Sequence, residues 1–425
     1  MINKFVLDEK PRMERYKNYY DGKQAILTHS YSDAERNSNK VVINYSKSIA
    51  DAYAGYLAAP GYISYRSNND IEHVMDVLRY NDYQEEDASF LLDALIYGRA
   101  CELMYVDSDS KTRFRLINPT TCFGIYDDSL TGDLMYFVRI YKASEWDSSD
   151  LHYVDVYSNS DIKHYKMAGL NGTPQLIEVK PHFFNQCPAN IFTLADEKSV
   201  FDCILSLQDA ANKMLTAEID DFEAFCDAYM VLRGVDLDPE DTVDMKKKRV
   251  LILPQSDASA EYLTKNANDA QIENIMKRIH ESIYRISQCV DFSSESFTGG
   301  VSSGVAIRFK LSGMETRGAK IVAEMKKALQ RRIEIICGVA SLKLGEEVFR
   351  DVEIEFKRNI PEDLTATINL INSLKGTVSD ATLLSQLPFI ADVNAELEKV
   401  AEQKAANMAM YSFGSSFGTE EEDEE

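Results

Sequence analysis

The residue types that perform catalysis are present in this chain, but their spacing forms no catalytic pattern. Residues 300–304 read Gly-Val-Ser-Ser-Gly, which formally matches the G-x-S-x-G turn of a nucleophilic serine. That turn needs a buried strand before it and a helix after it, whereas SSESFTG precedes it here. We therefore interpret the match as coincidental and expect no catalytic residue.

Patterns for metals, nucleotides and cofactors are missing as well. The six histidines never stand at H-x-x-x-H spacing, and no acidic cluster resembles a D-x-D-x-D-G calcium loop. Neither a phosphate-binding G-x-x-x-x-G-K-[ST] loop nor a G-x-G-x-x-G turn occurs. The seven cysteines contain no C-x-x-C pair, which indicates reduced core residues. We expect no metal and no cofactor, and a metal-dependent nuclease built from scattered carboxylates stays open as an alternative.

The charge of the chain disfavours tight DNA binding. The formal net charge is −23, and six of the negative charges come from the run 420–425. Proteins that read DNA sequence are usually basic, because Lys and Arg neutralise the phosphates. No run of about 18 apolar residues occurs, and the N-terminus is too charged for a signal peptide. The sequence thus predicts a soluble, intracellular protein without a membrane segment.

Helical signals flank a β-rich middle in the first half of the chain. Helical periodicity covers residues 1–60 and 71–97, and short strand-like runs fill 101–193. We expect the strands to form an antiparallel meander or a small sandwich. These signals predict an α+β fold.

The second half is organised around three long helical segments. An apolar stripe runs through 196–232, whose residues 200–232 carry seven Asp or Glu against one Lys. A heptad seam at 269–290 indicates a core-facing helix or a coiled coil. A third helix, from 305 to about 344, is basic, with nine Lys or Arg within 304–343.

Two connecting segments and the C-terminal part differ from these helices. Residues 233–268 form a short non-helical insert with a basic run and a strand-like VLILP at 250–254. Residues 291–304, DFSSESFTGGVSSG, are rich in Ser and Gly, which favours several backbone conformations. The remaining segments predicted are a strand at 352–356, helices at 361–376, after Ser379 and at 392–410, and a disordered acidic tail from Ser412.

The order of these segments resembles the portal proteins of tailed bacteriophages, in particular those of siphophages that infect Gram-positive bacteria. The most specific block is DFSSESFTGGVSSGVAIRFKLSGMETRGAK (291–320). Four further blocks are similar to portal sequences: RYKNYYDGKQAI (15–26), NKVVINYSKSIADAYAGYL (39–57), DALIYGRACELMYVD (93–107) and FKRNIPEDL (356–364). The resemblance covers nearly the whole chain.

The resemblance implies one subunit of a ring, usually of twelve, that forms the head-to-tail connector at one capsid vertex. Double-stranded DNA would be packaged through this ring by the terminase motor, retained and later ejected, without catalysis by the ring. The implied regions are a wing of helices and β-structure (1–195), two stem helices (196–232 and 269–290), a clip (233–268), a tunnel loop (291–304), a long wing or tunnel helix with a strand (305–355), a mostly helical crown (356–410) and a disordered acidic tail (411–425).

Three groups of candidate functional residues follow from the resemblance. The tunnel-loop residues, which would face DNA, are Ser296, Phe297, Thr298, Gly299, Gly300, Val301, Ser302 and Ser303. The clip run, either a partner contact or a solvated turn, is Lys246, Lys247, Lys248 and Arg249. The basic-helix residues are Arg308, Lys310, Lys320, Lys326, Lys327, Arg331 and Arg332. We favour pairing of this helix with an acidic face of the neighbouring subunit over contact with DNA in the channel wall.

The partners implied are further copies of the chain, double-stranded phage DNA, the terminase large subunit, a head-to-tail adaptor, and the major capsid and scaffold proteins. The implied location is the portal vertex of the virion, and the host cytoplasm during assembly. Two other classes are weighed against this reading. A scaffold or head-closure protein is usually shorter and lacks a Gly-Ser loop between two long helices. A phage DNA-processing enzyme would need a catalytic pattern that the sequence does not show.

Overall fold

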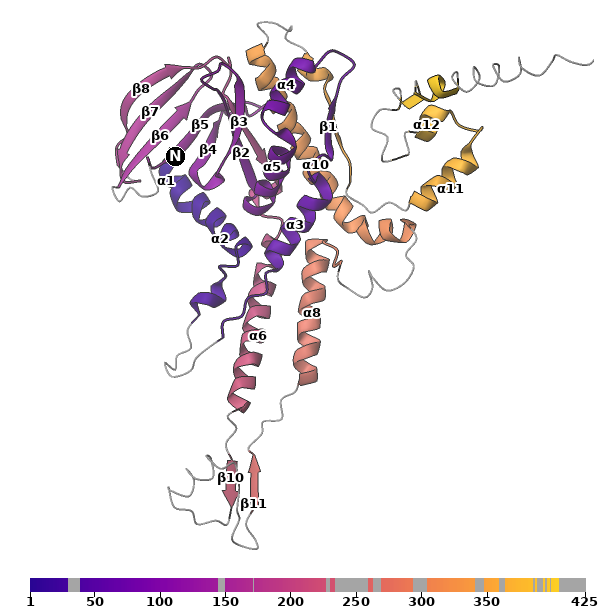
Figure 1. Cartoon of the computed structure of the whole chain (residues 1–425). Coiled ribbons are helices and arrows are strands. Elements are labelled where there is room, and N and C mark those ends of the chain that lie inside the picture. Colours follow the sequence, from indigo (N-terminus) through magenta and orange to yellow (C-terminus); the bar gives the residue numbers. More distant parts are fainter. Residues whose placement is uncertain are drawn as a thin grey trace, which may run out of the picture. The chain divides into compact units, whose positions relative to one another are not determined.

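The structure is a computed structural model (Figure 1) that divides into two compact units. The larger unit comprises Met1–Val301 and Arg308–Asn359, and the smaller comprises Ser302–Ile307 and Ile360–Glu425. Each is described by itself. The residues that the structure describes are 1–29, 39–143, 150–170, 172–226, 230–233, 259–262, 269–292, 304–340, 348–358, 364–384, 387, 393, 396–397 and 399–404.

The N-terminal helices of the larger unit pack around α5, which contacts α2, α3 and β2. The helix expected at 71–97 is broken in two, because Asp82 adopts a left-handed conformation (φ 51°) between α4 and α5. Gly98, also left-handed, ends α5. The bounds are α1 Ile2–Lys4, the π-helical turn η1 Phe5–Glu9, α2 Lys10–Tyr20, the 3-10 turn η2 Ala25–Thr28, α3 Tyr45–Ala58, α4 Glu72–Tyr80 and α5 Tyr83–Tyr97.

The β-rich middle forms two antiparallel sheets, a three-stranded one of order β3-β2-β9 and a five-stranded one of order β4-β5-β6-β7-β8. This confirms the α+β class. Side chains such as Cys101, Phe137 and Tyr157 from both sheets share one buried cluster. The strands are β2 Arg99–Val106, β3 Thr112–Ile117, β4 Cys122–Tyr126, β5 Leu134–Tyr141, β6 Leu151–Tyr157, β7 Asp161–Ala168, β8 Gln175–Pro181 and β9 Ala189–Thr193, with a 3-10 turn η3 at Pro119–Thr121.

A further strand pair joins distant parts of the chain. β1 (Ile63–Arg66), which the sequence did not predict, pairs with β12 (Glu353–Phe356), close to the expected strand. Next to this pair, Arg358 donates hydrogen bonds to both carboxylate oxygens of Glu315, at 2.9 and 2.8 Å. These contacts fasten the end of the larger unit to its long helix.

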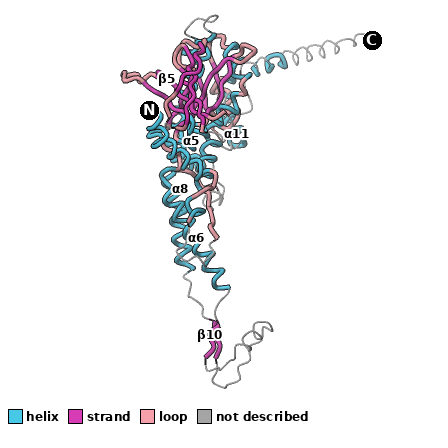
Figure 2. Tube along the Cα trace, turned by 90° about the vertical axis from the view of Figure 1, so that its left-hand side faces the viewer, coloured by secondary structure: helices cyan, strands magenta, loops and turns pink. Residues whose placement is uncertain are grey.

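Three long helices dominate the remainder of the larger unit. α6 (Leu205–Cys226) and α8 (Asp269–Ser287) lie side by side, as Figures 1 and 2 show. In the chain, the antiparallel pair β10 (Met230–Arg233) and β11 (Ser259–Tyr262) lies between them. α10 (Gly304–Ala340) follows the expected basic helix closely, and a 3-10 turn, η6, spans Val348–Asp351.

The helix expected at 196–232 is shorter than the sequence predicted. The expected helix 196–232 begins only at Leu205, after two 3-10 turns (η4 Ala195–Glu197 and η5 Asp202–Ile204), and β10 replaces its last residues. Asp196 and Glu197 have positive φ angles, which a continuous helix does not allow. A Cβ on Gly98 would lie 2.4 Å from the carbonyl oxygen of Glu197, so this turn is packed directly against the end of α5.

The smaller unit contains two described helices besides the first residues of α10. They are α11 (Leu364–Leu374) and α12 (Asp380–Leu384), close to the positions expected. Gly376, with φ 87°, follows α11 and ends it in the predicted way. The expected helix 392–410 is described only in part, at 393, 396–397 and 399–404, which are helical.

Candidate channel-forming region

Two of the three groups of predicted functional residues lie outside the described part of the chain. These are the tunnel-loop residues 296–303 and the clip run 246–249. The third group, on α10, is described in full. The geometry of the region is therefore set by α6, α8, α10 and the elements that hold them.

One face of α10 carries exposed cations. Arg308, Lys320, Lys326 and Lys327 are exposed and lie near one face by the helical period, and Lys310 is exposed as well. Lys327 pairs with Glu324 one turn away, at 2.8 Å. Such a surface pair adds little to stability because water screens it. These five cations lie at the surface of the subunit.

Arg332 does not belong to that exposed face, which corrects the sequence interpretation for this residue. Its side chain is fully buried and forms ion pairs with Asp87 of α5 and Glu102 of β2. Tyr65 donates a hydrogen bond to Asp87 at 2.7 Å, and Asn190 donates one to Glu102 at 3.2 Å. A buried cation needs such partners because removal from water is costly. Arg332 thus holds α10 to its own subunit and cannot reach a neighbour or DNA.

Two other arginines of α10 also serve the subunit itself. Arg331 is only about one-third exposed and donates to Gln186 at 2.6 Å. Arg317 donates to the carbonyl oxygens of Ser287 and Val200, at 2.8 and 2.7 Å. Ser287 is the last residue of α8, where a cation is favourable for the exposed carbonyls. Arg317 therefore connects α10 to the C-terminal end of α8 and to the segment that precedes α6.

A row of polar side chains, which we call the ladder, fixes α6 to an earlier segment of the chain. Four side chains of α6, one per turn, accept hydrogen bonds from backbone N–H groups of residues 39–46, which we call the strap. Three of these side chains are fully buried, and the fourth, Asp220, is 6% exposed. The acceptor atoms and donors are Gln208 Oε1 with Ser46 N (3.0 Å), Asn212 Oδ1 with Ile43 N (2.8 Å), Thr216 Oγ1 with Val41 N (3.1 Å) and Asp220 Oδ1 with Asn39 N (2.9 Å).

Two tyrosines of α2 form further hydrogen bonds to the beginning of α6 and to the turn before it. Tyr16 donates to Asp202 at 2.8 Å, and Tyr19 donates to Asp209 at 2.8 Å. Burial, and then the hydrogen bond to the carboxylate, raises the pKa of both tyrosines above the usual value, so both remain donors. Part of the acidity of α6 is thus used within the subunit.

Comparison with known proteins decides the family. The family model described as "Phage portal protein, SPP1 Gp6-like" matches residues 6–409. The chain belongs to this phage portal protein family. A curated relative, the portal protein of Bacillus phage SPP1, is 19% identical over 430 residues, which cover 94% of this chain and 82% of the relative. The resemblance inferred from the ordered sequence blocks is confirmed.

In this portal-family chain, the apolar seam of α8 is only partly covered. In this seam Ile283 is buried, but Ile286 is 47% exposed. Ile275, beside the seam, is 37% exposed. On α6, Phe222 is 69% exposed. Apolar rows on long helices are normally covered by another helix. The α6–α8 pair therefore leaves apolar surface for a partner outside the subunit.

The polar ladder of this portal-family structure has a signal in the sequence, although it was not predicted. The ladder residues of α6 recur every four positions, a polar row beside the apolar stripe, and such a row on a buried helix indicates specific hydrogen bonds. The described helices include none long and apolar enough to cross a membrane. Within the same residues, no group of three or more His, Cys, Asp or Glu could hold a metal ion.

Proposed function

We propose that this portal-family chain is one of twelve subunits of a ring that conducts double-stranded DNA into and out of a phage capsid. The observation that carries the proposal is the family match over residues 6–409 together with the α6–α8 pair, whose apolar seam stays half-exposed in a single subunit. Packing of such pairs side by side around a ring would cover these seams. A phage portal stands at the portal vertex of the virion.

The proposed regions follow the order of the chain. α6 and α8 form the stem, residues 233–268 the clip, and residues 291–304 the tunnel loop. The wing comprises 1–195 together with part of 305–355, and the crown comprises about 356–410. The ladder and Arg317 support this arrangement, because they connect the proposed stem helices to the proposed wing.

The charge of the chain suits passage of DNA. Each cation paired with a phosphate adds affinity through counterion release, and strong affinity would stall movement. A ring of subunits that each carry a net charge of −23 would instead repel the duplex and keep it centred. We propose that the exposed cations of α10 pair with an acidic face of the next subunit, for example that of α6, so that they hold the ring.

The proposed partners are those of a packaging connector: the terminase large subunit, a head-to-tail adaptor, the major capsid and scaffold proteins, and DNA in transit. The clip run 246–249 is a candidate contact for the motor or adaptor. The ring itself is proposed to act as a structural channel without catalysis, assembled in the host cytoplasm.

Electron microscopy of the purified full-length chain tests the ring directly. Negative-stain images should show rings with a central hole, and class averages should show twelve-fold symmetry. Mass photometry of the same sample should give the mass of the ring. A population of monomers or compact dimers at every protein and salt concentration would contradict the proposal.

A further inference from the structure

The tip of the β4–β5 hairpin presents an apolar side chain within an acidic loop. Leu130 is fully exposed there. Asp127, Asp128 and Asp133 surround it, and the segment 127–133 contains no Lys, Arg or His. We call this segment the knob. An exposed leucine by itself is common on protein surfaces, but this one stands at the tip of an acidic loop.

The knob is held in one conformation by its own hydrogen bonds. Asp127 Oδ1 accepts from the Ser129 hydroxyl at 2.7 Å and from the Asp133 backbone N–H at 2.9 Å. The Asp127 backbone N–H donates to the Asp133 carbonyl at 3.0 Å. The hydrogen bond from Ser129 lowers the pKa of Asp127, which keeps the carboxylate ionised. A preformed loop loses little conformational freedom on binding.

A groove of opposite character lies between the two sheets. Its volume is about 460 Å³, within the range of about 300–1,000 Å³ typical of binding pockets. Apolar side chains such as Ile117 and the 70%-exposed Phe183 line it, together with the cations Arg115 and Arg139 and with His182. No Asp or Glu lines this groove, although the chain has 69 acidic against 46 basic residues.

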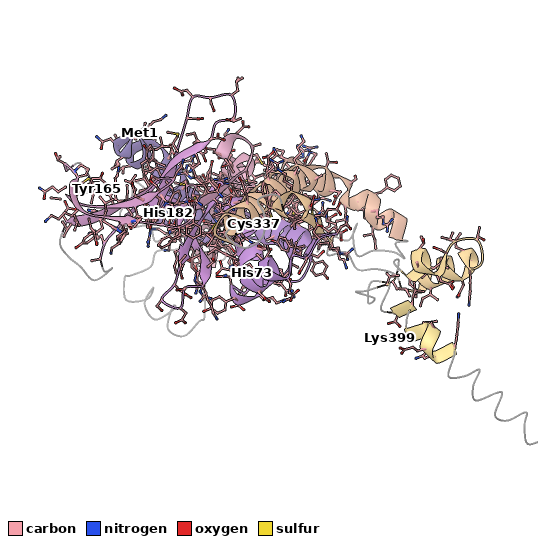
Figure 3. All side chains as sticks on the ribbon, turned by 90° about the horizontal axis from the view of Figure 1, so that it is seen from above. Met1, His73, Tyr165, His182, Cys337 and Lys399 are labelled. Carbon is pink, nitrogen blue, oxygen red and sulfur yellow. The ribbon has the colours of Figure 1, made fainter. Side chains whose placement is uncertain are left out.

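His182, one of the residues that line the groove, is labelled in Figure 3, where it lies between Tyr165 of β7 and Cys337 of α10. His182 is fixed there because its Nε2 lies 2.9 Å from the Ser158 carbonyl oxygen. The loop after His182 is supported by α10, since a Cβ on Gly338 would lie 3.2 Å from the Phe184 carbonyl oxygen. The groove is therefore walled by elements of the larger unit.

The knob of a subunit cannot enter the groove of the same subunit. Both involve β5, whose first residue, Leu134, follows the knob and whose Arg139 lines the groove. At about 3.4 Å per residue, these two residues are about 17 Å apart along the strand. A knob can thus fill only the groove of another copy. Such a contact joins two different surfaces of identical subunits, the type of contact that closes rings.

We propose that the knob of each subunit inserts Leu130 into the groove of a second copy of this chain, with its aspartates facing Arg115, Arg139 and His182. The opposite charges and the matched apolar knob and groove select this occupant. The inference rests on the proposed ring and names a contact that would join its wings. Arg115 already pairs with Glu86 at 3.1 Å, so it would be shared between two carboxylates.

Cysteine cross-linking of assembled rings tests the contact. In a Cys203→Ser background, which removes an exposed thiol, the variant Leu130→Cys with Phe183→Cys is treated with a short bismaleimide. Denaturing gels should show a ladder of covalent multimers up to the size of the ring. A mixture of the two single variants should give covalent dimers only. The pair Leu7→Cys with Phe183→Cys is the control, because Leu7 is also an exposed leucine, at 73%.

A second variant measures the contribution of the contact to assembly. Leu130→Asp should raise the protein concentration needed for half-assembly by about tenfold or more, as for a central interface residue. Its circular dichroism and melting temperature as a subunit should match wild type, because Leu130 touches nothing in the subunit that its loss would expose. Rings that assemble normally in this variant, or rings of the Leu130→Cys, Phe183→Cys variant that show no cross-link, would overturn the inference and leave the proposed function standing. A wild-type chain that forms no ring at all would overturn both.

Discussion

Arg332 of α10 and Glu102 of β2 face each other in the interior of the larger unit, 230 residues apart in the chain. Nε of Arg332 donates to Glu102 Oε2 at 2.9 Å, and Nη2 lies 2.9 Å from Oε1. Phe114 stacks on the guanidinium at 4.6 Å. The pair joins α10 to β2, the central strand of the three-stranded sheet, so these two elements are held together.

Removal of this cation should be among the most damaging single changes in the chain. Arg332→Met keeps much of the side-chain volume but leaves Asp87 and Glu102 buried without their counter-ion. We expect a loss of about 3–5 kcal/mol in the free energy of unfolding, measured by chemical denaturation. Lys327→Met on the exposed face is the control and should change stability by less than about 0.5 kcal/mol. A similar loss for both variants would contradict this account.

The ladder on α6 predicts a large effect from a nearly isosteric change. Thr216→Val removes the oxygen that accepts from the Val41 N–H and leaves this half-buried donor without its partner. The expected cost is about 1–3 kcal/mol, with faster hydrogen exchange at the Val41 amide. Hydrogen-exchange mass spectrometry of the strap measures it. Lys213→Ala, an exposed change on the same helix, should leave exchange in the strap as in wild type.

Gly98 and Gly61 form a matched pair for the effect of close packing. Both have left-handed backbones, with φ of 83° and 85°. A Cβ at Gly61 would have its nearest neighbour at 3.9 Å, whereas one at Gly98 would lie 2.4 Å from the Glu197 carbonyl oxygen. Gly61→Ala should cost about 1–2 kcal/mol, the backbone penalty alone. Gly98→Ala should cost clearly more in the same denaturation assay, and equal costs would refute the close approach.

Asp93 predicts a pH dependence of stability. Burial raises the pKa of its carboxyl group from 3.8 to about 6 in the folded chain. Because the folded state favours the protonated form, the wild type loses stability as the pH rises from about 4 through about 6. Asp93→Asn should therefore stabilise the chain by about 2 kcal/mol at pH 7.5 and by nothing at pH 3.5. Asp109→Asn, in an exposed loop, controls for the loss of one negative charge; a gain at pH 7.5 equal to that of Asp93→Asn would rule out burial as the cause.

The exposed cations of α10 distinguish two uses of the basic helix. Lys326→Glu with Lys327→Glu reverses two exposed charges. Their contacts within the subunit are a surface pair of Lys327 with Glu324 at 2.8 Å and the position of Lys326 over the Phe356 ring at 6.0 Å. If these lysines pair with the next subunit, ring formation should weaken, most clearly at low salt, where charge attraction is least screened. Mass photometry across salt concentrations measures this. Intact rings with impaired DNA retention in a packaging assay would instead assign the lysines to the channel wall.

The sequence predicted elements whose signals are local. The heptad pattern located α8 to within three residues at its end, and Gly376 marked the end of α11. Features set by distant partners were not predicted. β1 is a strand only because β12 pairs with it, and the turn at Asp196 is imposed by contact with the end of α5. The sequence placed Arg332 on the exposed basic face of the helix, and this prediction was wrong. Its side chain points into the subunit because its two carboxylate partners lie on α5 and β2.

The same limit applies to the proposed contact surfaces. An acidic hairpin tip such as DDSLTGD is an ordinary turn in the sequence, and the groove exists only where two sheets meet. The order of the segments nevertheless located the family, because a family likeness accumulates over many weak local matches.

The polar ladder also restricts how this chain can vary in length. A single residue inserted into α6 between Gln208 and Asp220 would turn every later side chain by about 100° and carry the remaining acceptors away from the strap. Insertions and deletions should thus be tolerated beyond Asp220, where the ladder ends, and not before it. Related chains in which α6 differs in length should differ beyond Asp220, while the twelve-residue step from Gln208 to Asp220 stays constant.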